Sequence, residues 1–252
     1  MLLTLVAGVL AMQNGASAKP EDTEVWKPEP PVVTAAAAVT TPPPSDAVVL
    51  FDGRDLSQWK STKDGGPARW TVRDGVVTVN KGTGNIETKR SFGSYQLHLE
   101  WKIPAGITGK GQARSNSGLF LASIGEGDLG YELQIMDSYQ NPTYVNGQAG
   151  SIYKQHPPLV NPARKPGEWQ SYDVVWTPPS FSADGAVTRP ATATVWMNGV
   201  LVQDHTALKG PTVYIGQPRY TPHGPAAIKL QDHGDPSAPI SFRNIWLREL
   251  GK

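Results

Sequence analysis

Apolar and polar positions alternate with a period of two along most of the chain after residue 47. The clearest case is residues 94–103, SYQLHLEWKI, where apolar side chains occupy the odd positions from 95 to 103 and polar ones the even positions between. This period places successive side chains on opposite faces of a β-strand. Comparable short runs predict further strands at 48–52, 117–123, 131–137, 171–176, 227–234 and 240–250.

Two pairs of strands are predicted to form hairpins. Residues 70–80 alternate on both sides of Asp74-Gly75, and residues 192–204 do so around Asn198-Gly199. Such dipeptides adopt the left-handed backbone of two-residue hairpin turns. No stretch of helical length shows apolar residues spaced three and four apart. The pattern therefore predicts one all-β domain over residues 47–252, built as an antiparallel sandwich or jelly roll.

The first 46 residues lack this alternation. Residues 1–18 contain an apolar run at 2–12 and end in Ala16-Ser17-Ala18, which is typical of a secretory signal peptide. Residues 19–46 are rich in proline and alanine and favour an extended linker, or a strap on the domain surface that Trp26 would pin in place. We therefore expect a periplasmic or secreted protein with no membrane span.

Composition excludes several classes of function. The 23 basic and 22 acidic residues give a net charge of +1, which argues against nucleic acid as a partner. The chain has no cysteine, so it lacks disulfides, thiolate metal sites and a cysteine nucleophile. Gly and Pro, 26 and 23 residues, favour a turn-rich β protein over a helix bundle. The 8 tryptophans could stack on sugar rings, but most are expected in the core.

The strand at 131–137, YELQIMD, carries the strongest candidate site. Alternation places Leu133 and Ile135 in the core and Glu132 and Gln134 on the opposite face. Asp137 is out of phase with Glu132, and we expect a β-bulge after Ile135 to return it to that face. Carboxylate pairs on β-sandwich strands are typical of glycoside hydrolases.

Further polar candidates come from other predicted strands. His233, with Gln231 two residues earlier, could act as a base or a metal ligand. Asn116 could donate to a substrate or cap a turn. Glu100 could line a sugar cleft or pair with His98 or Lys102, and Arg243 could bind a substrate oxygen or form a structural ion pair. From these residues alone, a sugar cleft is indicated and the reaction stays open.

A series of motifs, in order, resembles the 3-keto-disaccharide hydrolase family, long called domain of unknown function 1080. The resemblance extends from about residue 48 to residue 250 and rests on these motifs: LFDGRDLSQWK (50–60), W-x-V-x-D-G (70–75), LEWKIP (99–104), NSGLF (116–120), YELQIMD (131–137), GSIY (150–153), PGEWQSYDVVW (166–176), VWMNG (195–199), and LQDHG (230–234) followed by ISFRNIWLREL (240–250).

The resemblance implies a concanavalin A-like jelly roll that cleaves 3-keto-glycosides, by hydrolysis or by elimination and hydration through a 2-hydroxy-3-keto-glucal. It implies catalytic roles for Glu132, Asp137 and His233, which together could also hold a divalent metal ion. The substrate-binding residues implied are Glu100, Asn116, Gln134, Tyr153, Gln231 and Arg243. We expect a 3-keto-glycoside substrate, supplied by a glycoside 3-oxidoreductase, and no nucleotide or organic cofactor.

Two other readings compete with this one. A non-catalytic, lectin-like carbohydrate-binding module would have the same sandwich and would bind sugar without cleaving it. A conventional retaining glycosidase would need a second carboxylate where this chain has Gln134, which can form hydrogen bonds but cannot serve as an acid or a base.

Overall fold

The computed structural model describes residues 17–37 and 40–251. The predicted signal peptide, residues 1–18, therefore lies outside the described residues except for its last two. Within the described chain the helical elements are three short 3-10 turns: η1 (Pro20–Thr23), η2 (Gly111–Ala113) and η3 (Val145–Gly147). No helix among these residues has the length and apolarity needed to cross a bilayer.

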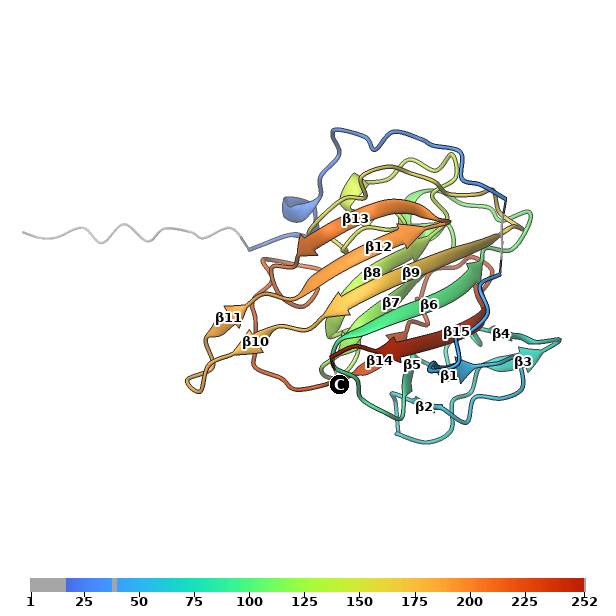
Figure 1. The fold of residues 1–252 in the computed structure, drawn as a ribbon. Helices are drawn as coiled ribbons and strands as arrows, with labels where there is room; N and C mark the ends of the chain where they lie inside the picture. The colour runs from blue at the N-terminus through green and yellow to red at the C-terminus, as the bar shows by residue number, and fades with distance from the viewer. Residues whose placement is uncertain (1–16, 38–39, 252) are drawn as a thin grey trace, which may run out of the picture.

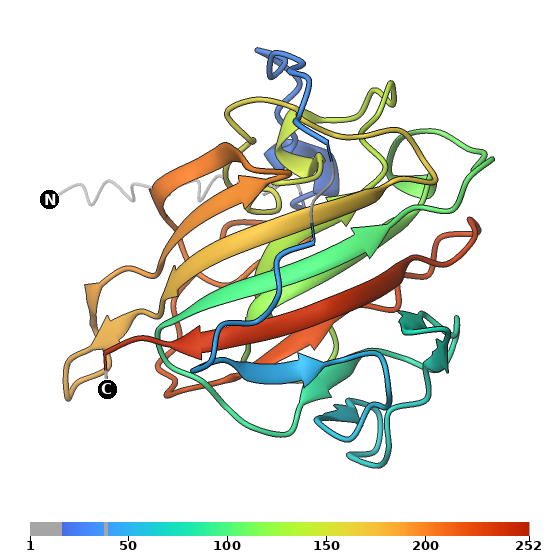
Figure 2. The ribbon, with the colours of Figure 1, turned by 45° about the vertical axis from the view of Figure 1, so that its right-hand side comes forward.

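Two antiparallel sheets stack face to face, which confirms the predicted all-β sandwich (Figures 1 and 2). The larger sheet has the order β13-β12-β9-β6-β15-β4-β3, with β1 also paired to β15; the smaller sheet has the order β2-β5-β14-β7-β8. The strands of the larger sheet are β1 (Val48–Phe51), β3 (Thr71–Arg73), β4 (Val76–Thr78), β6 (Tyr95–Lys102), β9 (Trp169–Thr177), β12 (Thr192–Met197), β13 (Val200–Ala207) and β15 (Ser241–Glu249). Those of the smaller sheet are β2 (Trp59–Ser61), β5 (Ile86–Thr88), β7 (Asn116–Ser123), β8 (Gly130–Met136) and β14 (Ala227–Leu230). A separate ribbon pairs β10 (Ser180–Phe181) with β11 (Val187–Arg189).

The core fills the space between the two sheets as the alternation predicts. On β6 the odd positions Leu97, Leu99 and Trp101 are fully buried. On β8, Leu133 and Ile135 are equally buried. Burying such side chains is the main favourable contribution to folding, about 1.5–3 kcal/mol for each large one. The inward faces of the strands therefore fix which of their residues point out of the sandwich.

Both predicted hairpin turns are present. Asp74 and Gly75 have φ of 51° and 77°, and Asn198 and Gly199 have φ of 55° and 78°. Each pair connects strands in register, Arg73 with Val76 and Met197 with Val200. Positive φ at both central residues matches the right-handed twist of the flanking strands, which explains the choice of Asp-Gly and Asn-Gly.

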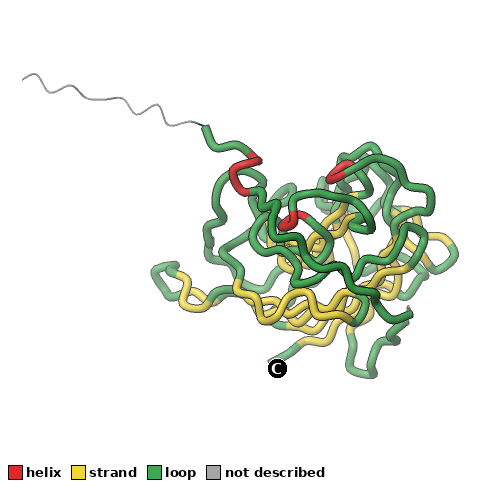
Figure 3. The backbone as a smooth tube through the Cα atoms, turned by 90° about the horizontal axis from the view of Figure 1, so that it is seen from above, coloured by secondary structure: helices red, strands yellow, loops and turns green. Residues whose placement is uncertain are grey.

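The Pro-rich segment, called the strap below (residues 19–37), lies on the domain along the upper edge of Figure 1. The Val145 backbone N–H donates to the Val25 carbonyl at 2.6 Å, and the Val33 N–H donates to the Asn161 carbonyl at 3.1 Å. Trp26 packs edge-on against Tyr144, with ring centroids 6.1 Å apart. Seen from above in Figure 3, the loops and short helices gather on one side of the strand layers. The strap is thus part of the surface that covers the smaller sheet.

Candidate functional site

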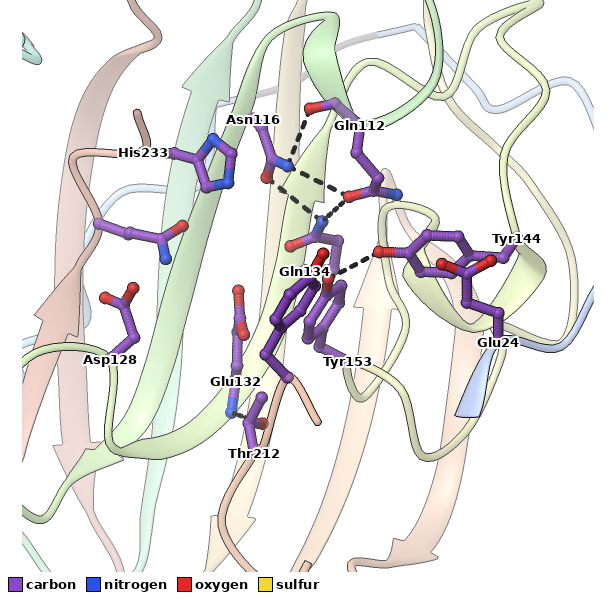
Figure 4. A pocket seen from close by; sticks show the side chains of 12 residues that line it. Glu24, Gln112, Asn116, Asp128, Glu132, Gln134, Tyr144, Tyr153, Thr212 and His233 are labelled. Carbon is purple, nitrogen blue, oxygen red and sulfur yellow. Dashed lines mark hydrogen bonds between the residues drawn. The ribbon is translucent and has the colours of Figure 1, made fainter. Parts of the chain in front are cut away.

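A pocket of about 620 Å³ opens on the face of the smaller sheet that points away from the core, a volume typical of small-molecule sites (Figure 4). It is lined by strands β7 and β8, the segment after β14, the strap, the turn η2 and the loops that follow β7, β8 and β13. Its lining residues are Glu24, Gln112, Asn116, Asp128, Glu132, Gln134, Tyr144, Tyr153, Thr212, Tyr214, Gln231 and His233. Six residues predicted from the sequence are among them: Asn116, Glu132, Gln134, Tyr153, Gln231 and His233.

Glu132 lies near the centre of this pocket on β8 (Figure 4). Its neighbours along the strand, Tyr131 and Leu133, are fully buried in the core, so alternation turns Glu132 outward. Gly118 on the adjacent strand β7 provides the space for its carboxylate. A Cβ atom at position 118 would lie 2.6 Å from Glu132 Oε1, closer than such atoms can approach.

Glu132 as a whole is only 5% exposed, so its carboxyl group is poorly solvated. Burial and, to a smaller extent, the nearby Asp128 carboxylate raise its pKa, and with Lys229 opposing the shift the pKa is about 8. Desolvation penalises the charged form of a carboxyl group, so Glu132 holds its proton at neutral pH. A buried acid that is protonated near pH 7 is suited to donate a proton to a leaving group.

Three amide side chains form a hydrogen-bonded cluster beside Glu132. Asn116 Nδ2 donates to Gln112 Oε1 at 3.1 Å, and Gln134 Nε2 donates to the same oxygen at 3.0 Å. If the Gln134 amide is turned over, its nitrogen instead donates to Glu132 Oε1 at 3.2 Å. Gln134 can therefore accept a hydrogen bond from protonated Glu132 or donate one to its carboxylate, which fits a neighbour whose proton moves.

His233 enters the pocket from the segment after β14. Its Nδ1 accepts a hydrogen bond from the Asp235 backbone N–H at 3.2 Å and also lies 3.3 Å from Asp235 Oδ2. Burial alone would raise the pKa of Asp235, but hydrogen bonds from His233, Ser237 and Lys81 hold it well below its usual range. When Nδ1 carries the proton, the ionised Asp235 carboxylate can accept its hydrogen bond, and the Nε2 lone pair can then act as a base.

The neighbouring Gln231 is 6% exposed, and its Oε1 is buried without a hydrogen-bond partner among the described residues. The hydroxyl groups of Tyr144 and Tyr153, which also line the pocket, lie 2.6 Å apart and share a hydrogen bond. Burial raises the pKa of both phenols, which therefore keep their protons and can donate. The pocket thus holds an acid, a base and several neutral hydrogen-bonding groups, a combination suited to a hydroxyl-rich ligand.

The prediction for Asp137 is wrong. Pairing between β7 and β8 is continuous from Phe120–Glu132 to Asn116–Met136, so no bulge follows Ile135 and Met136 keeps the outward phase. Asp137 is excluded from the pocket lining and lies 2.8 Å from Arg114 Nε in a buried ion pair. The geometry of this contact is not that of a hydrogen bond, and burial raises the pKa of Asp137 despite the Arg114 charge.

Glu100 and Arg243 lie outside the pocket as well, because β6 and β15 belong to the larger sheet. Arg243 Nε donates to Glu100 Oε2 at 2.6 Å, and His98 Nε2 lies 3.4 Å from Glu100 Oε1. Burial would raise the pKa of Glu100, but hydrogen bonds from His98, Asn244 and Arg243 lower it to about 2. Thr40, just after the strap, also contacts both Glu100 and Arg243. The structural ion-pair alternative for these two residues is therefore the one observed.

The proposed metal set of Glu132, Asp137 and His233 does not converge. Asp137 is engaged with Arg114, and the described part of the chain contains no group of three or more His, Asp or Glu side chains arranged to hold a metal ion. The residues present therefore do not fit the expected ion.

Several lining residues carried no signal in the sequence. Gln112 lies in the short 3-10 turn η2 and Tyr144 in the loop just before η3, and Thr212 reaches the pocket because its hydroxyl accepts a hydrogen bond from the Glu132 backbone N–H at 3.1 Å. Glu24 comes from the strap, far from the other lining residues in sequence. Strand alternation says nothing about such segments, because their placement depends on long-range contacts.

Comparison with known proteins agrees with this fold. A family model described as a 3-keto-alpha-glucoside-1,2-lyase-like domain matches residues 46–248. A 3-keto-disaccharide hydrolase from Bacteroides thetaiotaomicron is 27% identical over 158 residues, 51% of this chain and 51% of that protein. The chain thus matches about half the length of this curated relative.

Solved structures from Parabacteroides distasonis ATCC 8503 are also similar. One, provisionally described as a glycosyl hydrolase, is 51% identical, superposes with a TM-score of 0.80, and is matched over 99% of this chain and 100% of its own. Another with the same description, at 22% identity and a TM-score of 0.58 over 82% of this chain and 94% of its own, shares the fold. Because the family model covers most of the chain, the protein belongs to the 3-keto-disaccharide hydrolase family, whose domain is described as 3-keto-alpha-glucoside-1,2-lyase-like.

Proposed function

We propose that the protein cleaves 3-keto-glycosides by elimination across C1 and C2, followed by hydration of the resulting 2-hydroxy-3-keto-glucal. The observation that carries the proposal is the presence, in one pocket, of a buried protonated acid, Glu132, and a histidine oriented by an ionised carboxylate, His233 with Asp235. The family membership supports the choice of a 3-keto sugar as the substrate.

A ketone at C3 acidifies the hydrogen on C2 and makes the C1 oxygen a leaving group in the β position. In the first step His233 Nε2 removes the C2 proton, and the electron pair moves onto the C3 oxygen as an enolate. The enolate then re-forms the C3 carbonyl, the C1–C2 double bond forms, and the C1–O bond breaks. Glu132 gives its proton to the departing oxygen, so the aglycone leaves as a neutral alcohol.

The pocket offers neutral donors to the enolate oxygen. The phenols of Tyr144 and Tyr153 keep their protons, and because one hydroxyl donates to the other, the second hydroxyl is left to donate to the enolate oxygen. Donors aimed at developing charge in a site with little water stabilise the transition state more than the same groups do in solution.

Hydration reverses these proton transfers and gives net hydrolysis. Deprotonated Glu132 accepts a proton from a water molecule while the water oxygen adds to C1. Protonated His233 then returns a proton to C2. Each group then regains its starting state. Release of the glucal before this step would make the enzyme a lyase, and completion of the step would make it a hydrolase.

The decisive assay compares a chromogenic glucoside with its 3-keto form. Release of the chromophore from the keto form alone supports the proposal. Release from the plain glucoside would favour a conventional glycosidase, and release from neither, with sugar binding retained, would favour a lectin-like module. Glu132→Gln and His233→Ala should each lower turnover about 10²–10⁴-fold, because each removes one proton-transfer group.

We also propose that the protein acts outside the cytoplasm, downstream of an oxidoreductase that oxidises the C3 hydroxyl of a glycoside. The support for export is the predicted signal peptide at residues 1–18. N-terminal sequencing of protein recovered from an extracytoplasmic fraction should begin near Lys19. Retention of Met1 in that fraction would contradict export by signal cleavage.

A further inference from the structure

The strap and a neighbouring loop form one wall of the pocket, opposite His233. In Figure 4, Glu24 and Tyr144 lie on the right, His233 and Asp128 lie on the left, and Glu132 lies between them. Glu24 comes from the strap, which precedes the residues matched by the family model. The strap's part of this wall therefore lies outside the residues that the family model matches, and the loop that contains Tyr214 lies within them.

Lys154 joins the two parts of this wall. Its residue is only 8% exposed, and its ammonium donates to the Pro20 carbonyl in the strap and, at 3.0 Å, to the Tyr214 carbonyl in the loop. The same ammonium lies 4.7 Å from the centre of the Tyr214 ring. Lys154 follows Tyr153, a lining residue, so the wall is fixed directly to the pocket.

The wall contains one carboxylate, Glu24, and one solvent-exposed aromatic ring, Tyr214, and the exposed ring of Trp26 lies beside Glu24 in the strap. Trp26 and Tyr214 are 55% and 59% exposed, unusual for residues that bury so much area when covered. Trp26 Nε1 donates to Glu24 Oε2 at 3.2 Å, which orients the Glu24 side chain and leaves Oε1 available. Aromatic faces beside a carboxylate acceptor are suited to a sugar ring, which presents apolar C–H faces and hydroxyl donors.

We infer that Glu24, held by Trp26, and Tyr214 form a subsite for the leaving group, and that this leaving group is a neutral, hydroxyl-rich ring such as a second sugar. This inference rests on the proposed function. If His233 faces C2 and Glu132 faces the glycosidic oxygen, the bond to the aglycone continues past Glu132 toward the wall that contains Glu24. The strap thereby selects disaccharides over glycosides with small aglycones.

Glu24→Ala and Tyr214→Ala test the inference, with Glu29→Ala as the control. Glu29 also lies in the strap, but its side chain is 67% exposed and it pairs with Lys27 outside the pocket lining. Turnover is measured on a 3-keto-disaccharide with a glucose leaving group and on methyl 3-keto-glucoside, and thermal melts confirm folding of each variant.

The expected result is a loss of kcat/KM of about tenfold or more on the 3-keto-disaccharide for Glu24→Ala, mainly through KM, since a hydrogen bond to a charged group is lost. Turnover of methyl 3-keto-glucoside should change less than about twofold, and Glu29→Ala should match the wild type on both substrates. Equal losses on both substrates, or no loss on either, would overturn the inference.

Calorimetric binding of the unoxidised disaccharide separates this inference from the proposed function. If the wild type cleaves neither keto substrate, the proposed reaction fails, but the subsite still predicts that the disaccharide binds more tightly than methyl glucoside and that Glu24→Ala weakens only the disaccharide. Equal affinity of the wild type for the two sugars would overturn the subsite.

Discussion

Replacing Glu132 with glutamine should remove a large pH dependence from the stability of the protein. Glutamine keeps the size of the side chain but cannot ionise. In the wild type, the pKa of Glu132 is about 8 in the folded chain, against 4.5 for the exposed group. Between pH 4.5 and about pH 8, the folded chain therefore keeps a proton on Glu132 that the unfolded chain has released.

The sign and size of the effect follow from those two values. The stabilising contribution of protonated Glu132 is complete below pH 4.5, and it is lost as the pH rises toward 8, where the folded group also ionises. Each pKa unit corresponds to about 1.4 kcal/mol, so the wild type should lose roughly 3 kcal/mol from this group between pH 5 and pH 8.

The assay is denaturant unfolding of both proteins at pH 5 and pH 8. The loss in unfolding free energy over this interval should be smaller for Glu132→Gln by roughly 3 kcal/mol, since the contributions of all other groups cancel in the difference. Glu126→Gln, which changes an exposed carboxylate in the loop before β8, should follow the wild type. Parallel changes for wild type and Glu132→Gln would refute the argument that burial keeps Glu132 protonated.

Three further substitutions separate packing from chemistry. Leu133→Ala should lower the unfolding free energy by about 2–5 kcal/mol, because the side chain is fully buried, yet the folded fraction should keep its turnover in parallel melts and rate assays. Asp137→Asn should cost about 3 kcal/mol by leaving the buried charge of Arg114 without its partner, while KM for the 3-keto-glucoside stays near the wild-type value; a collapse of kcat without destabilisation would return Asp137 to the chemistry. Gly118→Ala should lower kcat at least about tenfold, because the new methyl group displaces the Glu132 carboxylate; unchanged kcat would show that the carboxylate position is not critical.

Strand alternation was sufficient to predict the sandwich and the half of the site that lies on strands. Leu133 and Ile135 must enter the core, so Glu132 and Gln134 must face outward, and that conclusion needs no tertiary information. Asn116 and His233 follow from the neighbouring strand and the segment after β14. The same reasoning failed for Asp137, because it required an irregularity that the regular β7–β8 register does not contain.

Alternation also does not identify the sheet to which a strand belongs. Glu100 has the outward phase of its strand, as Glu132 does, but β6 pairs into the larger sheet and turns Glu100 toward Arg243. Glu24 was unpredictable for a different reason, since its place in the pocket depends on the hydrogen bond between Val25 and Val145. Contacts across long sequence separations decide both cases.

The reaction performed in deuterated water tests the elimination most directly. If His233 removes the C2 hydrogen and later returns a proton from solvent, the 3-keto-glucose released from a 3-keto-glucoside should carry deuterium at C2. A parallel incubation of 3-keto-glucose without enzyme corrects for spontaneous exchange. Enrichment well above that background is the predicted result, and a product that keeps its original C2 hydrogen would contradict the account.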